Sequence, residues 1–174
     1  MVRGMLRTGF RAAGLLIALA LVSCSLDVRA DASKGVARFL DAVRTGDRAA
    51  FEASIDRPAL RADLRDQLAE LGRANGLDVE GGASEFALDR MITPEAFRLV
   101  EAQTGQALPV APTAAQVALL MHVQDRKHVC LGEAVQGHCL LAFAKRRGSW
   151  RLVGMRATEL KVVALPEPAK SKKR

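Results

Sequence analysis

The spacing of apolar residues changes along this chain, and that change restricts the possible fold more than any other feature. In SKGVARFLDAVRTGD, residues 33–47, apolar side chains recur at intervals of three and four, which is typical of an amphipathic helix. In the last third, the short apolar segments KHVCLGEA, HCLLAFAKR and SWRLVGMRATEL are separated by glycine-containing turns, which is typical of an antiparallel meander. The pattern therefore predicts an α+β fold, with four to five N-terminal helices packed on a C-terminal antiparallel sheet of three or more strands.

Residues that favour helix ends predict where the first three helices begin and end. Ser33 can begin the first helix and Gly46 can end it, while Asp47 and Asp56 can cap a short second helix and a longer third one. The third helix carries an apolar stripe that we expect to lie in the core. Its members are Leu60, Leu64, Leu68 and Leu71.

The middle of the chain gives weaker signals. We expect one helix in SEFALDRMI, residues 84–92, and another in PEAFRLVEAQ, residues 94–103, which Gly105 would end. In the following segment, Thr113 and Gln116 fit a capping box, but the apolar residues after them alternate as in a strand. We interpret that segment as a helical turn that runs into a strand.

The amino terminus has the features of an export signal. Residues 1–11 contain three arginines and no acidic residue, and Ala12–Val22 is an uninterrupted run of eleven apolar residues. A membrane-spanning helix needs about 20 such residues, whereas the apolar core of a secretory signal has about 7–15. We therefore expect the body of the protein to be exported.

Three fates of this signal are open. LVSC, residues 21–24, resembles the lipobox of bacterial lipoproteins, in which the cysteine is lipidated and becomes the first mature residue. VRA, residues 28–30, resembles an ordinary signal-peptidase site, and an uncleaved anchor is the third possibility. We favour the lipobox because it ends the apolar run, which makes Cys24 the lipidation site. Ser25 follows it in place of an Asp, which in lipoproteins indicates the outer membrane.

The chain thus divides into a signal peptide at 1–23, a linker at 24–32, a single α+β domain at 33–165 and a disordered basic tail at 166–174.

The formal net charge is +7. When the three arginines of residues 1–11 and the four basic residues of 170–174 are removed from the total of 26, 19 basic side chains remain against 19 acidic ones. Because the body is neutral, we predict no nucleic-acid partner. In KRRGSWR, residues 145–151, we expect a solvated turn with Trp150 in the core.

The order of motifs resembles one protein family. TGD, IDRPALR and ITPE, at residues 45–47, 55–61 and 92–95, are its most specific pieces, and a terminal strand centred on GSWRL completes the pattern. On these residues the chain resembles the bacterial domain of unknown function 2939 family, from about Val36 to Met155. The resemblance implies an exported or membrane-anchored α+β protein and transfers no functional residue. A more distant fold analogy is to nuclear-transport-factor-like, cystatin-like cones, and fold alone does not give function.

No catalytic or cofactor-binding motif is evident. There is no GxSxG elbow, and GLDVEGG lacks the Lys-Ser/Thr ending of a phosphate-binding loop. Asp63, Asp66 and Glu70 lie opposite the leucine stripe among arginines, so we predict that they are surface ion-pair partners. We therefore expect no enzymatic activity, no catalytic residue and no cofactor.

HVCLGEAVQGHC, residues 128–139, raises the choice between a metal site and a disulfide. His138 and Cys139 are neighbours and would point to opposite faces of a strand, so at most three of the four ligand-type side chains can converge, and we predict no metal. A disulfide between Cys130 and Cys139 fits an exported protein. A hairpin loop with an even number of residues would place the two cysteines opposite each other, and a three-residue loop would not.

Together these features predict an uncharacterised exported envelope protein that is periplasmic and lipid-anchored to the outer membrane. Its domain is expected to be a non-enzymatic binding or accessory domain. The alternative is a small-ligand-binding cone with a pocket between helices and sheet, with or without hydrolytic chemistry. A concave pocket with a few converging polar groups would favour the ligand-binding class.

Overall fold

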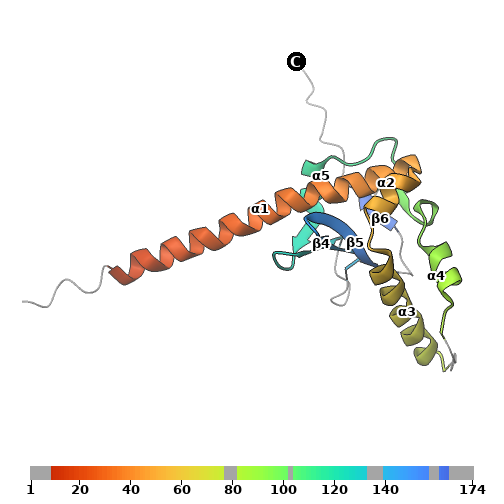
Figure 1. Ribbon diagram of the computed structural model, residues 1–174. Coiled ribbons are helices and arrows are strands. Elements are labelled where there is room, and N and C mark those ends of the chain that lie inside the picture. The colour runs from red at the N-terminus through yellow and green to blue at the C-terminus, as the bar shows by residue number, and fades with distance from the viewer. Residues whose placement is uncertain (1–8, 77–81, 102–103, 133–138, 157–160, 165–174) are drawn as a thin grey trace, which may run out of the picture.

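The structure is a computed structural model that describes residues 9–76, 82–101, 104–132, 139–156 and 161–164, without the side chains of residues 9–26 and 161–164. Most helices precede the sheet strands, which confirms the predicted α+β class (Figure 1). The helices are α1 (Gly9–Thr45), α2 (Arg48–Ala53), α3 (Arg57–Ala74), α4 (Glu85–Met91), the 3-10 helix η1 (Pro94–Ala96) and α5 (Ala114–Leu120). The strands are β1 (Arg98–Glu101), β2 (Met121–Val123), β3 (His128–Leu131), β4 (Leu141–Arg146), β5 (Ser149–Met155) and β6 (Lys161–Ala164).

The predicted caps of the short helices are confirmed. The side chain of Asp47 accepts a hydrogen bond from Ala50 N at 3.0 Å at the start of α2. Asp56 does the same for α3, whose second residue is Pro58. Thr113 and Gln116 form the capping box of α5, which runs directly into β2 as predicted. Each cap satisfies backbone N–H groups that the helix itself leaves free, so local sequence sets these starting points.

Helix α1 is longer than predicted. We expected it to begin at Ser33 after a linker at 24–32, but it runs without a break from Gly9 to Thr45. Ser33 is buried, and its hydroxyl donates to the carbonyl oxygen of Ala30 at 3.0 Å in place of capping a helix start. Residues 24–32 contain neither Gly nor Pro, so nothing in them interrupts helical hydrogen bonding. Within the described residues, no helix has the length and apolar character needed to cross a membrane.

The C-terminal sheet has four antiparallel strands in the order β2-β3-β4-β5. The predicted meander is therefore confirmed, and β2 extends it by one strand. Arg147 and Gly148 form the two-residue turn between β4 and β5, and both have positive φ. That conformation is typical of the tight hairpin turns that match the twist of paired strands.

The helix predicted over residues 94–103 is wrong. Only Pro94–Ala96 form a short 3-10 helix, and the chain then continues as β1, which pairs in parallel with β6. Phe97 and Leu99 are buried, while Arg98 between them is exposed, and this alternation has the period of a strand. The prediction failed because the pairing partner lies about 60 residues further along the chain, where no local signal reveals it.

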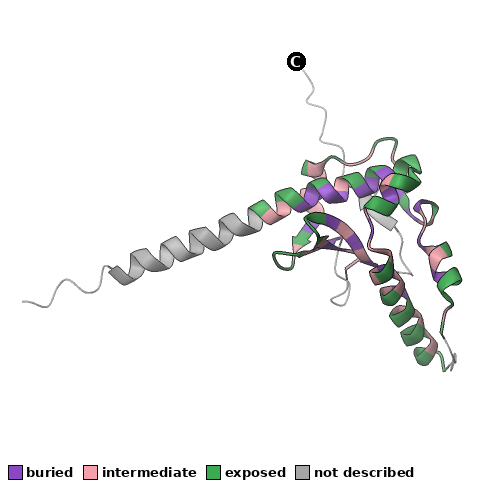
Figure 2. Cartoon of the chain, viewed as in Figure 1, coloured by how far each residue is buried: buried purple, intermediate pink, exposed green. Residues whose placement is uncertain are grey.

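The core lies between α1 and the four-stranded sheet. Four phenylalanine rings meet there, with Phe39 of α1 at 5.4–5.7 Å from the other three ring centroids, which belong to Phe51, Phe97 and Phe143. Figure 2 shows the buried residues of α1 on the part of the helix that crosses this core. Aromatic pairs at these separations add to the stability that burial alone provides.

The leucine stripe of α3 is only partly in the core. Leu60 and Leu64 are fully buried and Leu68 packs against the core, but Leu71 is 41% exposed. The prediction was therefore wrong for Leu71. The last turns of α3 extend beyond the sheet (Figure 2), so no described residue covers the end of the stripe.

One close contact fixes how α1 lies on the sheet. A Cβ atom built on Gly35 would lie 2.7 Å from the Cβ of Trp150, the second residue of β5. That separation is shorter than any normal contact between carbon atoms. A glycine at position 35 therefore allows the helix backbone to approach the strand.

Candidate binding groove

The disulfide predicted between Cys130 and Cys139 is present, with Cα atoms 5.4 Å apart. That separation is within the usual range for disulfides. Cys130 is buried in β3, while Cys139 precedes β4 and is half-buried. The side-chain amide of Gln124 donates to the Cys139 sulfur at 3.3 Å. The bond therefore connects the interior of the sheet to the chain segment that leads into β4.

The two cysteines do not face each other within the β3–β4 ladder. Cys130 lies opposite Ala142 in β4, not opposite Cys139. Gly132 has a φ of +88° and turns the chain away directly after β3, so the ladder ends before it reaches Cys139. The loop length that was left open depends on residues 133–138, and these lie outside the described residues.

His128 has a structural partner. Its Nδ1 lies 2.8 Å from the Asp125 carboxylate, which also accepts from the backbone N–H of Lys127 at 2.6 Å and that of His128 at 2.9 Å. The Lys127 N–H, and after it His128, hold the pKa of Asp125 below its ordinary value. These contacts close the turn between β2 and β3. Across the described part of the chain, no three His, Cys, Asp or Glu side chains are grouped so that they could hold a metal ion, and His138 lies outside that part.

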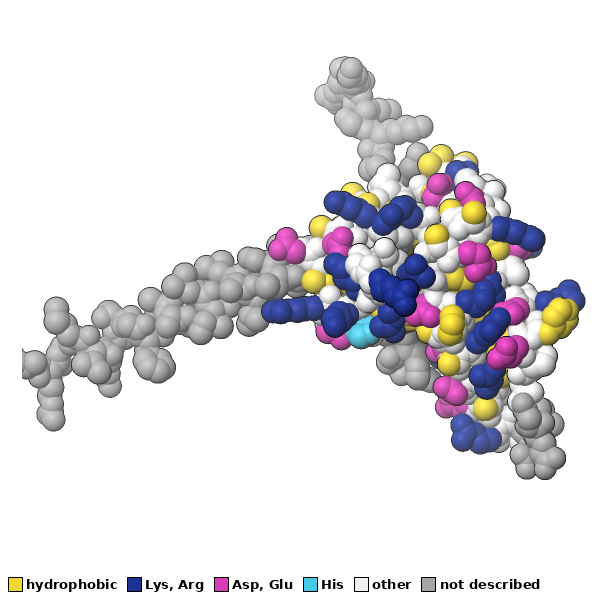
Figure 3. All heavy atoms as spheres, in the orientation of Figure 1, with side chains coloured by type: hydrophobic (Ala, Val, Ile, Leu, Met, Phe, Trp, Pro, Cys, Tyr) yellow, Lys and Arg dark blue, Asp and Glu magenta, His cyan; other side chains and the backbone are white. Residues whose placement is uncertain are grey.

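The acidic residues of α3 and α4 have roles that the sequence did not reveal. Asp63, which was expected to be a surface ion-pair partner, also accepts from the backbone N–H of Met155 at 2.9 Å and so connects α3 to the end of β5. Between α3 and α4, Asp89 accepts from Arg57 and from Arg61, at 3.1 and 2.6 Å. Arg61, and after it Arg57, lower the pKa of Asp89. Figure 3 shows acidic and basic side chains interleaved on the visible face of the molecule.

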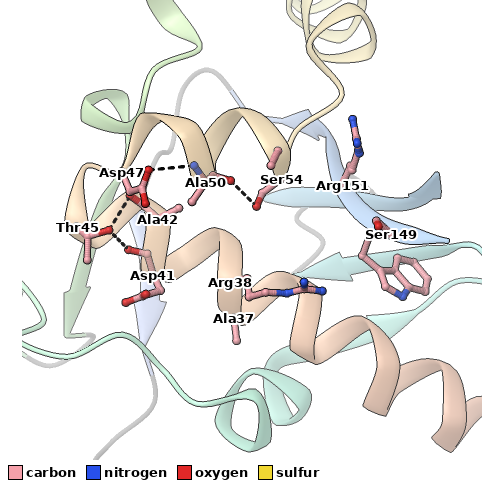
Figure 4. Close-up of a pocket in the computed structure, with 13 residues that line it drawn as sticks. Ala37, Arg38, Asp41, Ala42, Thr45, Asp47, Ala50, Ser54, Ser149 and Arg151 are labelled. Atoms are coloured by element: carbon pink, nitrogen blue, oxygen red, sulfur yellow. Dashed lines mark hydrogen bonds between the residues drawn. The ribbon is translucent and has the colours of Figure 1, made fainter. Parts of the chain in front are cut away.

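A groove of about 610 Å³ lies between α1, α2 and the first residues of β5 (Figure 4). Its α-helical walls are built largely from small side chains, which leave the space open. These are Gly35, Ala37, Ala42, Ala50 and Ala53. Ser149, Trp150 and Arg151 form the wall on the sheet side. The groove thus lies between helices and sheet, at the edge strand.

Polar groups on the helical side of the groove already have partners. The Thr45 hydroxyl donates to the carbonyl oxygen of Asp41, and the Ser54 hydroxyl donates to that of Ala50, both at 2.8 Å. Asp47 accepts from a helix N–H, and the Asp41 carboxylate pairs with Arg44 at 3.1 Å. Neither hydroxyl contacts a base that would activate it as a nucleophile. These groups therefore give this side of the groove its shape and its polar surface, and they offer no activated nucleophile.

The opposite end of the groove retains hydrogen-bonding capacity. In Figure 4, Asp41 and Asp47 lie at one end, Ser149 and Arg151 lie at the other, and Arg38 extends from α1 toward Ser149. Neither Arg38 nor Arg151 forms an ion pair within the described residues, and the Nε of Arg151 is buried without a hydrogen-bond partner. Because neither guanidinium has a carboxylate partner among the described residues, this end favours a ligand group that accepts hydrogen bonds.

A second concavity of about 470 Å³ lies between the loop 106–113 and α5. Its polar Thr113 and Gln116 side chains are already bound to each other in the capping box. Apart from Glu101, its lining carries no charged side chain. It therefore offers fewer free polar groups than the first groove.

Trp150 points into the core, as predicted, and its ring nitrogen has a partner on α1. Its Nε1 donates to Asp31 at 2.9 Å, and Lys145 Nζ donates to the same carboxylate oxygen at 2.7 Å. The hydrogen bond from Lys145, and after it that from Trp150, hold the pKa of Asp31 below its ordinary value of 3.8. This cluster ties α1 to both strands of the last hairpin beside the groove.

Comparison with known proteins gives one match. Residues 32–100 match the family described as "Protein of unknown function (DUF2939)". Neither a curated protein nor a solved structure matches the chain. The match confirms the family resemblance, over a shorter range than the sequence motifs indicated. It contains the helical walls of the groove and ends before the strand that forms the other wall.

Asp31 should stabilise the fold in a pH-dependent way. Its pKa is lower in the folded than in the unfolded chain, so its contribution is present above the unfolded pKa and is lost as the pH falls through the folded pKa. We expect Asp31→Asn to lower the free energy of unfolding near neutral pH, and the difference from wild type to shrink as the pH falls below 3.8 and to vanish below the folded pKa. Urea unfolding at several pH values measures this. Asp41→Asn, which affects a surface pair within one helix, is the control, and an equal effect of both variants at neutral pH would contradict the prediction.

Proposed function

We propose that this chain, whose residues 32–100 belong to the DUF2939 family of proteins of unknown function, is an exported envelope protein. Its α+β domain would be a non-enzymatic binding domain on the periplasmic side, tethered to the outer membrane through lipid on Cys24. The tether is supported by the sequence: three arginines, an eleven-residue apolar run and the lipobox-like LVSC follow one another in the order of a lipoprotein signal.

The groove is the observation that supports binding. It is open, it is lined by residues from two helices and a strand, and its arginine end has donors without protein acceptors. The space between α1 and the sheet is filled by phenylalanine rings, so the groove, not the interior, is the place for a ligand. This position between helices and sheet edge also favours the second candidate, a small-ligand domain of the cone type. Hydrolysis has less support, because the hydroxyls of Thr45 and Ser54 donate to backbone carbonyls.

The tether is tested by the mature amino terminus. Mass spectrometry of protein isolated from the envelope should find Cys24 as the first residue, carrying lipid. Cys24→Ala should give a folded protein that is either unprocessed or released from the membrane. A mature chain that starts at Asp31, or one that retains Met1, would contradict the proposal.

Binding in the groove is tested by filling it. Ala53 lines the groove at the end of α2, and Ala49 is exposed on the same helix outside it. Both positions can be changed to Trp, which adds a similar bulk to the same helix. In pull-downs from envelope membranes, we expect Ala53→Trp to lose partners or ligands that wild type and Ala49→Trp retain. Equal capture by both variants, with unchanged thermal unfolding, would contradict a binding role for the groove.

A further inference from the structure

Two turns of the sheet lie together at one end of the domain. The β2–β3 turn spans residues 124–127, and the β4–β5 turn contains Arg147 and Gly148. The backbone N–H of Lys145 donates to the carbonyl oxygen of Lys127 at 2.8 Å, so the two turns are adjacent. We call this region the turn end of the domain, and its exposed cations are Arg126, Lys127, Arg146 and Arg147.

The turn end carries more positive charge than the protein neutralises, because its one acidic residue, Asp125, contacts His128 and the backbone N–H groups of its own turn. Lys145 pairs with Asp31 and Arg146 pairs with Asp56, at 2.7 and 3.3 Å. Arg126, Lys127 and Arg147 have no acidic partner among the described residues, and all three are exposed.

Three arginines of α3 provide a contrast. Arg57 and Arg61 each contact two carboxylates, and Arg65 lies 4.0 Å from Glu85. Because the body as a whole has as many acidic as basic side chains, the excess positive charge at the turn end is a local feature. Exposed cations without partners attract anionic surfaces over about 8–10 Å at moderate salt.

Helix α1 leaves the domain beside the turn end. Asp31 contacts Lys145 and Trp150 there, and the residues before it form the part of α1 that projects away from the sheet (Figure 1). Figure 3 shows Lys and Arg side chains gathered around the place where this helix departs. From Cys24 to Asp31 the helix rises about 10 Å, at 1.5 Å per residue. A membrane held at Cys24 would therefore lie within the range of these charges.

We propose that the turn end is a docking surface for anionic phospholipid headgroups, with Arg126, Lys127 and Arg147 as its main contacts. This proposal rests on the proposed tether, which would place the surface next to a bilayer. The contacts would be electrostatic, because the three side chains are solvated and lie on turns with no exposed aromatic side chain among the described residues of the turn end. Docking would set the orientation of the domain and so the direction in which the groove opens. Basic side chains near an anionic membrane each raise partitioning by about fivefold.

The single tryptophan of the chain allows a direct test. Trp150 lies at the turn end, so energy transfer from it to a dansyl group on lipid headgroups reports how closely that end approaches the bilayer. The mature full-length protein would be placed in vesicles of phosphatidylcholine alone or with phosphatidylglycerol. We expect higher transfer on the anionic vesicles, and loss of the difference at high salt.

Matched charge variants identify the surface. The docking variant combines Arg126→Gln, Lys127→Gln and Arg147→Asn, the last because Asn tolerates the positive φ of that position. The control combines Arg73→Gln, Arg90→Gln and Arg98→Gln, three exposed arginines on α3, α4 and β1. We expect the docking variant to lose the gain in transfer on anionic vesicles and the control to keep it.

Flotation of the same samples separates this proposal from the tether. In one outcome, wild type and docking variant both float with both kinds of vesicle and show equal energy transfer on both. That outcome overturns the docking surface and leaves the tether intact. Protein that fails to float with phosphatidylcholine vesicles, but floats with anionic ones in a salt-dependent way, contradicts the tether and supports the docking surface. Equal loss of transfer in the docking and control variants also overturns the proposal, because total charge alone would then explain it.

Discussion

The contact between Gly35 and Trp150 determines how the two halves of this protein fit together. Because residue 35 has no side chain, α1 approaches the edge of the sheet closely enough for Asp31 to accept hydrogen bonds from Trp150 and Lys145. The same approach brings Phe39 against Phe143 of β4, with ring centroids 5.5 Å apart. Interiors of proteins are close-packed, so a helix held further away would leave voids along this whole face.

Both candidate surfaces also depend on this helix. Small side chains and Arg38 of α1 form one wall of the groove, and Trp150 and Arg151 of β5 form the other. One turn earlier in the helix, Asp31 lies beside the turns of the sheet. The family match covers the helical wall but ends at residue 100, so the strand wall and the turn end belong to the part of the chain outside that match. A ligand that contacts both walls would be recognised by residues inside the family match and by residues outside it.

Features with local causes could be predicted from the sequence. The caps at Asp47, Asp56 and Thr113 depend on one side chain and a backbone N–H two or three residues away, and all were found. The order of strands in the meander follows from short turns, and it was also found. The Cys130–Cys139 bond was predicted from the number of cysteines and an expected compartment, but its register was not, because Gly132 ends the ladder early.

Other features depend on partners that are distant in the sequence. Residues 98–101 form a strand because β6 pairs with them, and Asp63 contacts the sheet because the Met155 N–H donates a hydrogen bond to its carboxylate. The sequence pointed to no lining residue of the candidate groove as a ligand contact: Asp47 was noted as a helix cap, and Trp150 and Arg151 were noted as part of a turn and a strand. Small residues such as Ala37 and Ala53 carry no chemical signature, and only the packing of α2 against α1 and β5 gives them a role.

The Gly35→Ala variant tests the central contact most directly. In an ordinary helix interior, replacing Gly by Ala stabilises a protein by about 1 kcal/mol. Here the added Cβ would meet that of Trp150 at 2.7 Å, so we predict a loss of about 1–3 kcal/mol in the free energy of unfolding, measured by urea titration with circular dichroism. Lys34→Ala, at the exposed neighbouring position, should change it by less than about 0.5 kcal/mol. A Gly35→Ala protein more stable than wild type would contradict the account.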